Sequence, residues 1–206
     1  MAVNYEFVDW DHCYQLCQNV YGRLAKTGYE PDVVVGMARG GWVPARILAD
    51  LLVTGQTANV KVEFYRDIYE TQESPRIVQP VSGETRWKRV LVVDDIADTG
   101  RSLKATVDHL KAQKVAELRT ICLHIKPWTE FLPDFHAAVS RAWVVYPWEL
   151  KEFVFAFANQ LSSMGVAPEE AERRLNELKP PMPLAGEFIR QWRTASKKPS
   201  SKAVHT

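Results

Sequence analysis

The stretch that decides the fold of this chain is Val90-Leu91-Val92-Val93-Asp94-Asp95-Ile96-Ala97-Asp98-Thr99-Gly100-Arg101-Ser102-Leu103. Its four consecutive branched apolar residues predict a strand that is buried on both faces. A buried carboxylate without a partner is strongly unfavourable. We therefore expect Asp94 and Asp95 at the carboxyl end of the strand, where they face a crevice.

The residues after Asp98 predict a turn that opens a helix. Apolar side chains recur at spacings of four and three at Leu103, Val107 and Leu110, which suits a helix with one buried face. The glycine and hydroxyl residues between positions 99 and 102 leave backbone N–H groups unpaired at the positive end of the helix dipole. This arrangement predicts a phosphate site.

A second strand, loop and helix come earlier in the chain. Residues 33–37 are apolar throughout, Ala-Arg-Gly-Gly follows at 38–41, and helical spacing returns over residues 43–52. We expect further strands at residues 60–65, 118–125 and 142–146, and an N-terminal helix that ends near Thr27. Alternating strands and helices predict an α/β fold with a doubly wound, mostly parallel sheet, which binds ligands at the carboxyl ends of its strands.

Composition excludes several classes of partner. The 206 residues include 26 Lys and Arg against 25 Asp and Glu, so no overall charge favours nucleic acid or a membrane. No apolar run approaches the roughly 20 residues that span a bilayer, and no leader pattern opens the chain, so we expect a cytoplasmic protein.

The three cysteines and five histidines show no spacing typical of a metal site, and we expect the cysteines to be reduced and structural.

The pattern changes after Glu149. We predict one domain over residues 1–150, a helical appendage over 151–194 and a disordered tail over 195–206, which is rich in Lys, Ser and Pro. Within the appendage, helices are expected from Pro168 to about Leu178 and from Glu187 to Arg193.

Residues 90–103 resemble the phosphoribosyl diphosphate (PRPP) motif of type I phosphoribosyltransferases. In that family the two acids hold the ribose hydroxyls and bear on a magnesium ion, and the following turn wraps the 5′-phosphate. The resemblance implies Mg²⁺ at Asp94 and Asp95, and a PRPP site made by Asp94, Asp95, Ile96, Ala97, Asp98, Thr99, Gly100, Arg101 and Ser102. Two alternatives are a solvated acidic turn and the phospho-acceptor site of receiver domains, although in the latter the third acid lies on another strand.

Residues 36–44, Gly-Met-Ala-Arg-Gly-Gly-Trp-Val-Pro, resemble the diphosphate loop of bacterial xanthine-guanine phosphoribosyltransferases. The resemblance assigns Ala38, Arg39 and Gly40 to the diphosphate, although Arg-Gly-Gly alone also suits a plain turn. The polar segment between residues 65 and 89 corresponds to a mobile hairpin that closes over the reacting centre in this family. In the family this hairpin contributes a basic residue to the departing diphosphate. Arg76 is the first candidate for that residue and Arg66 the second. The alternative is that both arginines are solvated surface residues.

Further resemblances concern the base. Lys126, at the end of a predicted strand, matches a lysine that donates to the purine O6 in 6-oxopurine enzymes. Trp143 matches an aromatic residue that stacks on the base, and Val144 matches a residue whose carbonyl faces the group on C2. Asp98 matches the candidate proton acceptor at the base N7.

Together these resemblances imply a Mg²⁺-dependent 6-oxopurine phosphoribosyltransferase, with Asp98, Arg39 and Arg76 as catalytic residues. Its substrates are PRPP and guanine, xanthine or hypoxanthine, and we expect a homodimer or homotetramer. The alternatives are a PRPP-binding regulator without turnover and an enzyme for another base such as adenine. The C-terminal helices serve either as an oligomer contact or as a cover for the base pocket.

Overall fold

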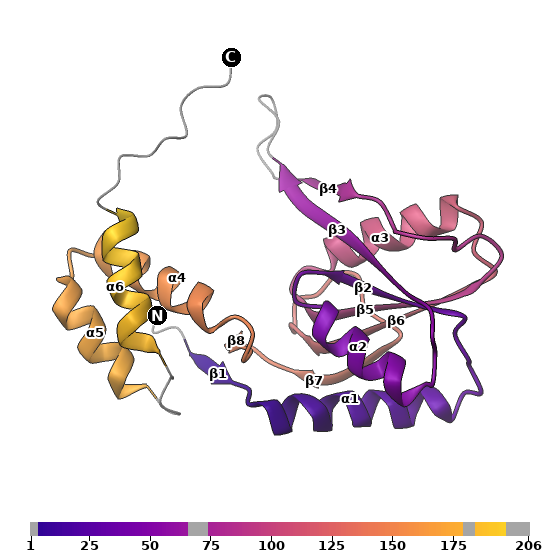
Figure 1. Ribbon diagram of the computed structural model, residues 1–206, viewed down its shortest axis with the longest axis horizontal. Coiled ribbons are helices and arrows are strands. Elements are labelled where there is room, and N and C mark those ends of the chain that lie inside the picture. The colour runs from indigo at the N-terminus through magenta and orange to yellow at the C-terminus, as the bar shows by residue number, and fades with distance from the viewer. Residues whose placement is uncertain (1–3, 66–73, 179–183, 197–206) are drawn as a thin grey trace, which may run out of the picture. The chain divides into compact units, whose positions relative to one another are not determined.

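The computed structural model describes residues 4–65, 74–178 and 184–196. Within these ranges the chain forms two compact units. Unit 1 consists of Asn4 and Trp10–Trp143, and unit 2 consists of Tyr5–Asp9 and the residues from Val144 onward. Figure 1 shows the elements of each unit.

A six-stranded sheet with helices on both faces forms the centre of unit 1 (Figure 1). The strand order is β4-β3-β2-β5-β6-β7, and all neighbours pair in parallel except β3 and β4. The strands are β2 (Val33–Ala38), β3 (Thr57–Tyr65), β4 (Ser74–Gln79), β5 (Arg89–Ala97), β6 (Glu117–Ile125) and β7 (Phe135–Val139). Helices α1 (Trp10–Ala25) and α2 (Trp42–Leu51) cover one face, and α3 (Arg101–Ala112) covers the other. The predicted α/β architecture with a mostly parallel sheet is confirmed.

The two central strands are buried as the sequence predicts. Residues 33–35 of β2 and 90–93 of β5 are at most 4% exposed, because α2 and α3 cover the two faces of the sheet. The apolar run of β5 ends where burial of its side chains decreases, at Asp94. Because β2 and β5 pair in parallel, the loops that follow them lie at the same edge of the sheet.

The prediction for residues 142–146 is wrong in its pairing. These residues were expected to form a strand of the main sheet, but β8 (Trp143–Val145) pairs with β1 (Tyr5–Phe7) in a separate two-stranded sheet. The sheet position beside β6 belongs to β7, which the sequence did not predict. Its five residues include no long apolar run, because β7 is a half-buried edge strand.

The segment between residues 65 and 89 is less irregular than predicted. β4 returns antiparallel to β3, with Glu63 opposite Arg76 and Tyr65 opposite Ser74. Residues 66–73, between these two strands in the chain, lie outside the described residues and include Arg66. The structure thus shows the base of a hairpin here, and its motion stays a prediction.

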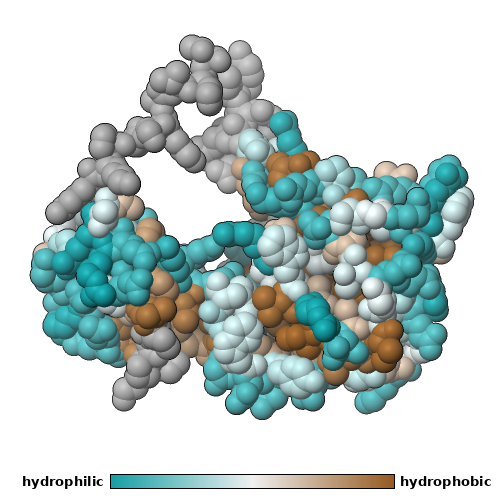
Figure 2. All heavy atoms as spheres, viewed as in Figure 1, coloured by the Kyte–Doolittle hydropathy of each residue, from teal (hydrophilic) through white to brown (hydrophobic). Residues whose placement is uncertain are grey.

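Unit 2 is mainly helical, with α4 (Leu150–Ser163), α5 (Pro168–Glu177) and α6 (Ala185–Ser196). The helices share an apolar core that includes Phe153, Leu175 and Ile189, while hydrophilic residues cover much of their outer surface (Figure 2). Ala195, which the sequence placed at the start of a disordered tail, lies in α6; residues 197–206 are outside the described part. None of the described helices has the length and hydrophobicity needed to cross a membrane.

Candidate active site

A pocket of about 350 Å³ lies at the carboxyl end of β5. It contains every residue that the resemblance assigns to PRPP except Asp95, and adds two apolar ones: its lining is Phe64, Asp94, Ile96, Ala97, Asp98, Thr99, Gly100, Arg101, Ser102 and Leu103. The volume is that of a small-molecule site. A strand end, a turn and the start of α3 together form one concave surface.

Gly100 makes the turn into α3 possible. It has a φ of 79°, in the left-handed region, and a Cβ at this position would lie 2.4 Å from the carbonyl oxygen of Phe131. Both observations require glycine. The following residues, Arg101 and Ser102, line the pocket with the first turn of the helix, whose N–H groups have no partners within the helix. The pocket therefore has the character of an anion site.

The loop after β6, residues 126–131, holds the same turn from outside the pocket. The backbone N–H of Lys126 donates to the carbonyl oxygen of Ala97 at 3.1 Å. The hydroxyl of Thr129 lies 2.8 Å and 2.6 Å from the carbonyl oxygens of Ala97 and Asp98. These bonds occupy carbonyl groups of the turn and fix its position relative to β6.

The neighbouring carboxylates of Asp94 and Asp95 lie in different surroundings. Asp94 lines the pocket, and its Oδ1 accepts a hydrogen bond from the backbone N–H of Asp95 at 3.0 Å. Asp95 is only 5% exposed, and a Cβ at Gly40 would lie 1.7 Å from its Oδ2. Asp95 thus packs against the loop between β2 and α2, which contains the cis Ala38–Arg39 peptide bond. The predicted diphosphate loop and the predicted ribose site are in contact through this one carboxylate.

The donor set fits a magnesium ion that shares its ligands with a substrate. Carboxylate oxygens suit Mg²⁺, which commonly takes one or two carboxylates together with water and substrate phosphates. Among the described residues, no group of three or more His, Cys, Asp or Glu could form a protein cage for a metal. Asp94, which lines the pocket, offers a carboxylate of the kind that suits such an ion, whereas Asp95 is buried against Gly40.

The cysteines of the described chain behave as buried structural residues. Cys13, Cys17 and Cys122 are buried and form no disulfide. Burial raises the pKa of Cys17 to about 12, and burial with the nearby charges of Asp94 and Asp95 raises the pKa of Cys122 well above its usual value. The thiols of Cys17 and Cys122 therefore remain protonated at neutral pH and are poor nucleophiles.

Asp98, the predicted proton acceptor, is exposed at the rim of the pocket. Its Oδ1 accepts a hydrogen bond from the indole Nε1–H of Trp128 at 2.7 Å. Trp128 is itself 50% exposed. Trp128 follows Lys126 by two positions and was not predicted as a site residue.

Lys126 is buried, and its Nζ donates to the carbonyl oxygen of Ala142. The same Nζ lies 5.9 Å from the centroid of the Trp128 ring. Trp143, one residue beyond Ala142, is 47% exposed and belongs to unit 1. Val144 is buried and belongs to unit 2.

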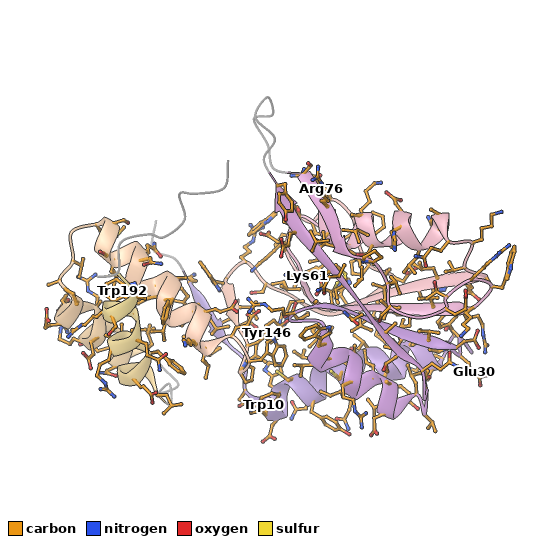
Figure 3. All side chains as sticks on the ribbon, turned by 45° about the horizontal axis from the view of Figure 1, so that its top comes forward. Trp10, Glu30, Lys61, Arg76, Tyr146 and Trp192 are labelled. Atoms are coloured by element: carbon orange, nitrogen blue, oxygen red, sulfur yellow. The ribbon has the colours of Figure 1, made fainter. Side chains whose placement is uncertain are left out.

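The predicted basic residues belong to different elements. Arg39 is exposed in the loop after β2. Arg76 lies on β4 (Figure 3). Its Cζ is 5.3 Å from the centroid of the Tyr65 ring. Neither lines the pocket. The basic residue of the pocket is Arg101, whose Cζ lies 5.8 Å from the ring centroid of Phe64.

Phe64 is a pocket residue that sequence reasoning missed. It lies near the end of β3, which runs parallel to β2 and β5 in the same sheet, so its strand ends at the edge where the pocket lies. The position of β3 in the sheet order was not predicted. The available signal was that the carboxyl ends of parallel strands lie at the same edge of a sheet, which would have placed the end of β3 near the pocket.

Comparison with known proteins agrees with this geometry. The sequence matches the family model of the phosphoribosyl transferase domain over residues 6–156. Xanthine phosphoribosyltransferase 1 of Saccharomyces cerevisiae is 24% identical over 188 residues, covering 71% of this chain and 90% of the relative. Xanthine-guanine phosphoribosyltransferase of Gluconobacter oxydans is 26% identical over 150 residues, covering 72% of this chain and 86% of the relative.

A solved structure extends the comparison to the fold. The crystal structure of a purine phosphoribosyltransferase from Pyrococcus horikoshii matches with a TM-score of 0.64 and 32% sequence identity, covering 70% of this chain and 93% of that one. The family match spans most of the chain and includes both the pocket and the loop after β2. The chain therefore belongs to the phosphoribosyl transferase domain family.

Proposed function

We propose that this protein transfers the phosphoribosyl group of PRPP to a 6-oxopurine base and releases diphosphate. The observation that carries the proposal is the pocket at the end of β5, where an acid, a glycine turn and a helix N-terminus meet. Relatives named for xanthine, guanine and hypoxanthine support the choice of base.

In this proposal the turn binds the 5′-phosphate. The N–H groups at the start of α3 and the guanidinium of Arg101 supply hydrogen bonds and positive charge. Asp94 and Asp95 accept hydrogen bonds from the ribose hydroxyls. Bound Mg²⁺ would neutralise negative charge that develops on the departing diphosphate.

The leaving group is assigned to the loop after β2. Ala38 and Gly40 offer backbone that an anion can approach closely, and Arg39 offers a guanidinium that can bind two oxygens at once. Arg76 is the basic residue assigned to the β3–β4 hairpin, with Arg66 as the alternative. Closure of the hairpin would exclude water from the reacting centre.

The reaction exchanges one bond at the anomeric carbon. The lone pair of purine N9 forms the bond to C1′, the bond from C1′ to the diphosphate oxygen breaks, and the proton on N7 passes to the carboxylate of Asp98. Lys126 donates to O6, Trp143 stacks on the ring, and the carbonyl of Val144 faces the group on C2. Holding the three reactant groups in line supplies much of the rate acceleration.

The proposal is tested by steady-state assays with PRPP, Mg²⁺ and each of guanine, hypoxanthine, xanthine and adenine, with nucleotide formation measured by chromatography. We expect turnover of at least one 6-oxopurine, with kcat/KM for adenine lower by about a hundredfold or more, because the adenine amino group offers Lys126 a donor instead of an acceptor. PRPP binding without turnover would favour the regulator. Preference for adenine would reject the assignment of the base.

Gly40 offers a direct test of the contact between the two loops. We expect Gly40→Ala to displace the carboxylate of Asp95, because the added Cβ would lie 1.7 Å from Oδ2. The dissociation constant for PRPP in the presence of Mg²⁺, measured by calorimetry, should rise about tenfold or more, which corresponds to losing one hydrogen bond to a charged group.

The matched control is Gly55→Ala. Gly55 has an ordinary φ, and no heavy atom would approach its added Cβ within 4 Å. Its PRPP affinity should equal that of the wild type. Equal affinities for the two variants would show that Asp95 can move without affecting the site.

A further inference from the structure

Trp128 lies beside the two polar groups that the proposed function assigns to the purine. Its indole Nε1–H donates to Asp98 Oδ1 at 2.7 Å, and its ring centroid lies 5.9 Å from Lys126 Nζ. All three residues belong to unit 1. With 50% of its surface exposed, the indole is not held by burial. Its orientation therefore depends on this hydrogen bond and on the backbone that carries it.

That backbone is tied to the turn that carries Asp98. The hydroxyl of Thr129, the next residue, lies 2.6 Å from the carbonyl oxygen of Asp98 and 2.8 Å from that of Ala97. The backbone N–H of Glu130 donates to the carbonyl oxygen of Thr99 at 3.0 Å. The Cα atoms of Trp128 and Asp98 are thus held in a defined relation before any ligand binds. Their side-chain hydrogen bond costs correspondingly little conformational entropy.

The hydrogen bond distinguishes the two oxygens of the Asp98 carboxylate. Oδ1 is occupied by the indole N–H, and within the described part of the chain Oδ2 accepts no hydrogen bond. A carboxylate with one oxygen fixed cannot rotate freely, so its other oxygen keeps a defined direction. A proton acceptor is effective only when it is held in the correct geometry relative to the proton that it accepts.

We propose that Trp128 is a positioning residue that orients the carboxylate of Asp98, so that Oδ2 receives the proton from purine N7. This inference rests on the proposed function, because it deepens the role assigned to Asp98 there. It differs from a role of Trp128 as a stacking surface for the base. A stacking role would depend on the aromatic ring, whereas the positioning role depends on the N–H group.

Trp128→Phe separates these roles, because it keeps an aromatic ring and removes the donor. We expect kcat for the preferred base to fall about tenfold, the effect of one hydrogen bond to a charged group, while KM for PRPP stays within about twofold. The matched control is Trp87→Phe. Trp87 is 65% exposed and precedes the amino end of β5, away from the pocket, so its kinetic constants should match those of the wild type. An unchanged kcat in Trp128→Phe, or a change only in KM for the base, would overturn the proposal.

A double-mutant cycle shows whether Trp128 acts through Asp98. In an Asp98→Asn background, Trp128→Phe should change kcat by less than about twofold, because the carboxylate to be oriented is gone. A further tenfold loss in that background would mean that Trp128 acts independently, and the proposal would fail.

A spectroscopic measurement keeps the test separate from the proposed function. The indole ¹⁵N–¹H resonance of Trp128, assigned by its loss in Trp128→Phe, should shift in Asp98→Asn, because replacing the charged acceptor weakens the hydrogen bond. A resonance that does not move would overturn the positioning role even if the enzyme is active. If the wild type converts no purine, the proposed function fails, whatever the resonance shows.

Discussion

Asp98→Asn should lower kcat by about 10²- to 10⁴-fold, the range typical of removing a general base. The asparagine can still accept the hydrogen bond from Trp128 through its Oδ1. Its amide nitrogen then faces the purine N7 as a donor and cannot accept a proton. In the proposed site the 5′-phosphate is bound by the N–H groups at the start of α3 and by Arg101, which this substitution leaves in place, so the affinity for PRPP should change little.

The measurement combines steady-state kcat with the dissociation constant for PRPP from calorimetry. A large fall in kcat at nearly constant PRPP affinity identifies Asp98 as a group that acts in the transition state. Equal losses in both quantities would assign Asp98 a binding role only. Asp108→Asn, on the exposed side of α3, is the control, and it should leave both quantities unchanged because Asp108 forms an exposed ion pair with Lys104 on the surface of that helix.

Gly100→Ala should damage both stability and PRPP binding. A side chain at a φ of 79° costs about 1–2 kcal/mol, and the added Cβ would also meet the Phe131 carbonyl oxygen at 2.4 Å. We expect a loss of about 2 kcal/mol or more, which lowers the Tm by about 4–8 °C. Because the first turn of α3 must shift away from Phe131, PRPP affinity should fall by at least about tenfold.

Gly28→Ala provides the matched control for backbone strain. Gly28 has a φ of 69° in the same unit, but a Cβ there would meet no heavy atom within 4 Å. Its Tm should fall by less than that of Gly100→Ala, and its PRPP affinity should be unchanged. If Tm fell equally in both variants, the contact between the added Cβ and Phe131 would contribute nothing to the loss of stability. If Gly100→Ala bound PRPP with the affinity of the wild type, the turn would not be part of the phosphate site.

Strands and helices with strong local patterns were predictable from the sequence. The apolar run of residues 90–93 became β5, and the spacing of Leu103, Val107 and Leu110 became the buried face of α3. These signals are local because burial on both faces of a strand, or along one face of a helix, repeats at a fixed interval in the sequence. Short elements lack such a repeat. β7 and β8 are defined by their pairing partners, and neither partner could be identified from five or three residues.

The candidate site shows the same division. The resemblance identified the residues of the turn from Asp94 to Ser102, and the structure brings all but one of them to a single pocket. Asp95 departs from this set because it packs against Gly40, a residue 55 positions earlier whose place is set by the neighbouring strand β2. Phe64 and Trp128 were missed because their positions beside Arg101 and Asp98 depend on strand order and on a loop 30 residues away.

The sequence by itself determined the central strands, the helices beside them and the polar residue types of one turn, because each depends on residues close together in the chain. Only the tertiary structure decided why Gly100 must be glycine, which oxygen of Asp98 is occupied, and which carboxylate meets the loop after β2. Those features are contacts between segments brought together by parallel strands. Their distances depend on the register of the whole sheet, which no short stretch of sequence encodes.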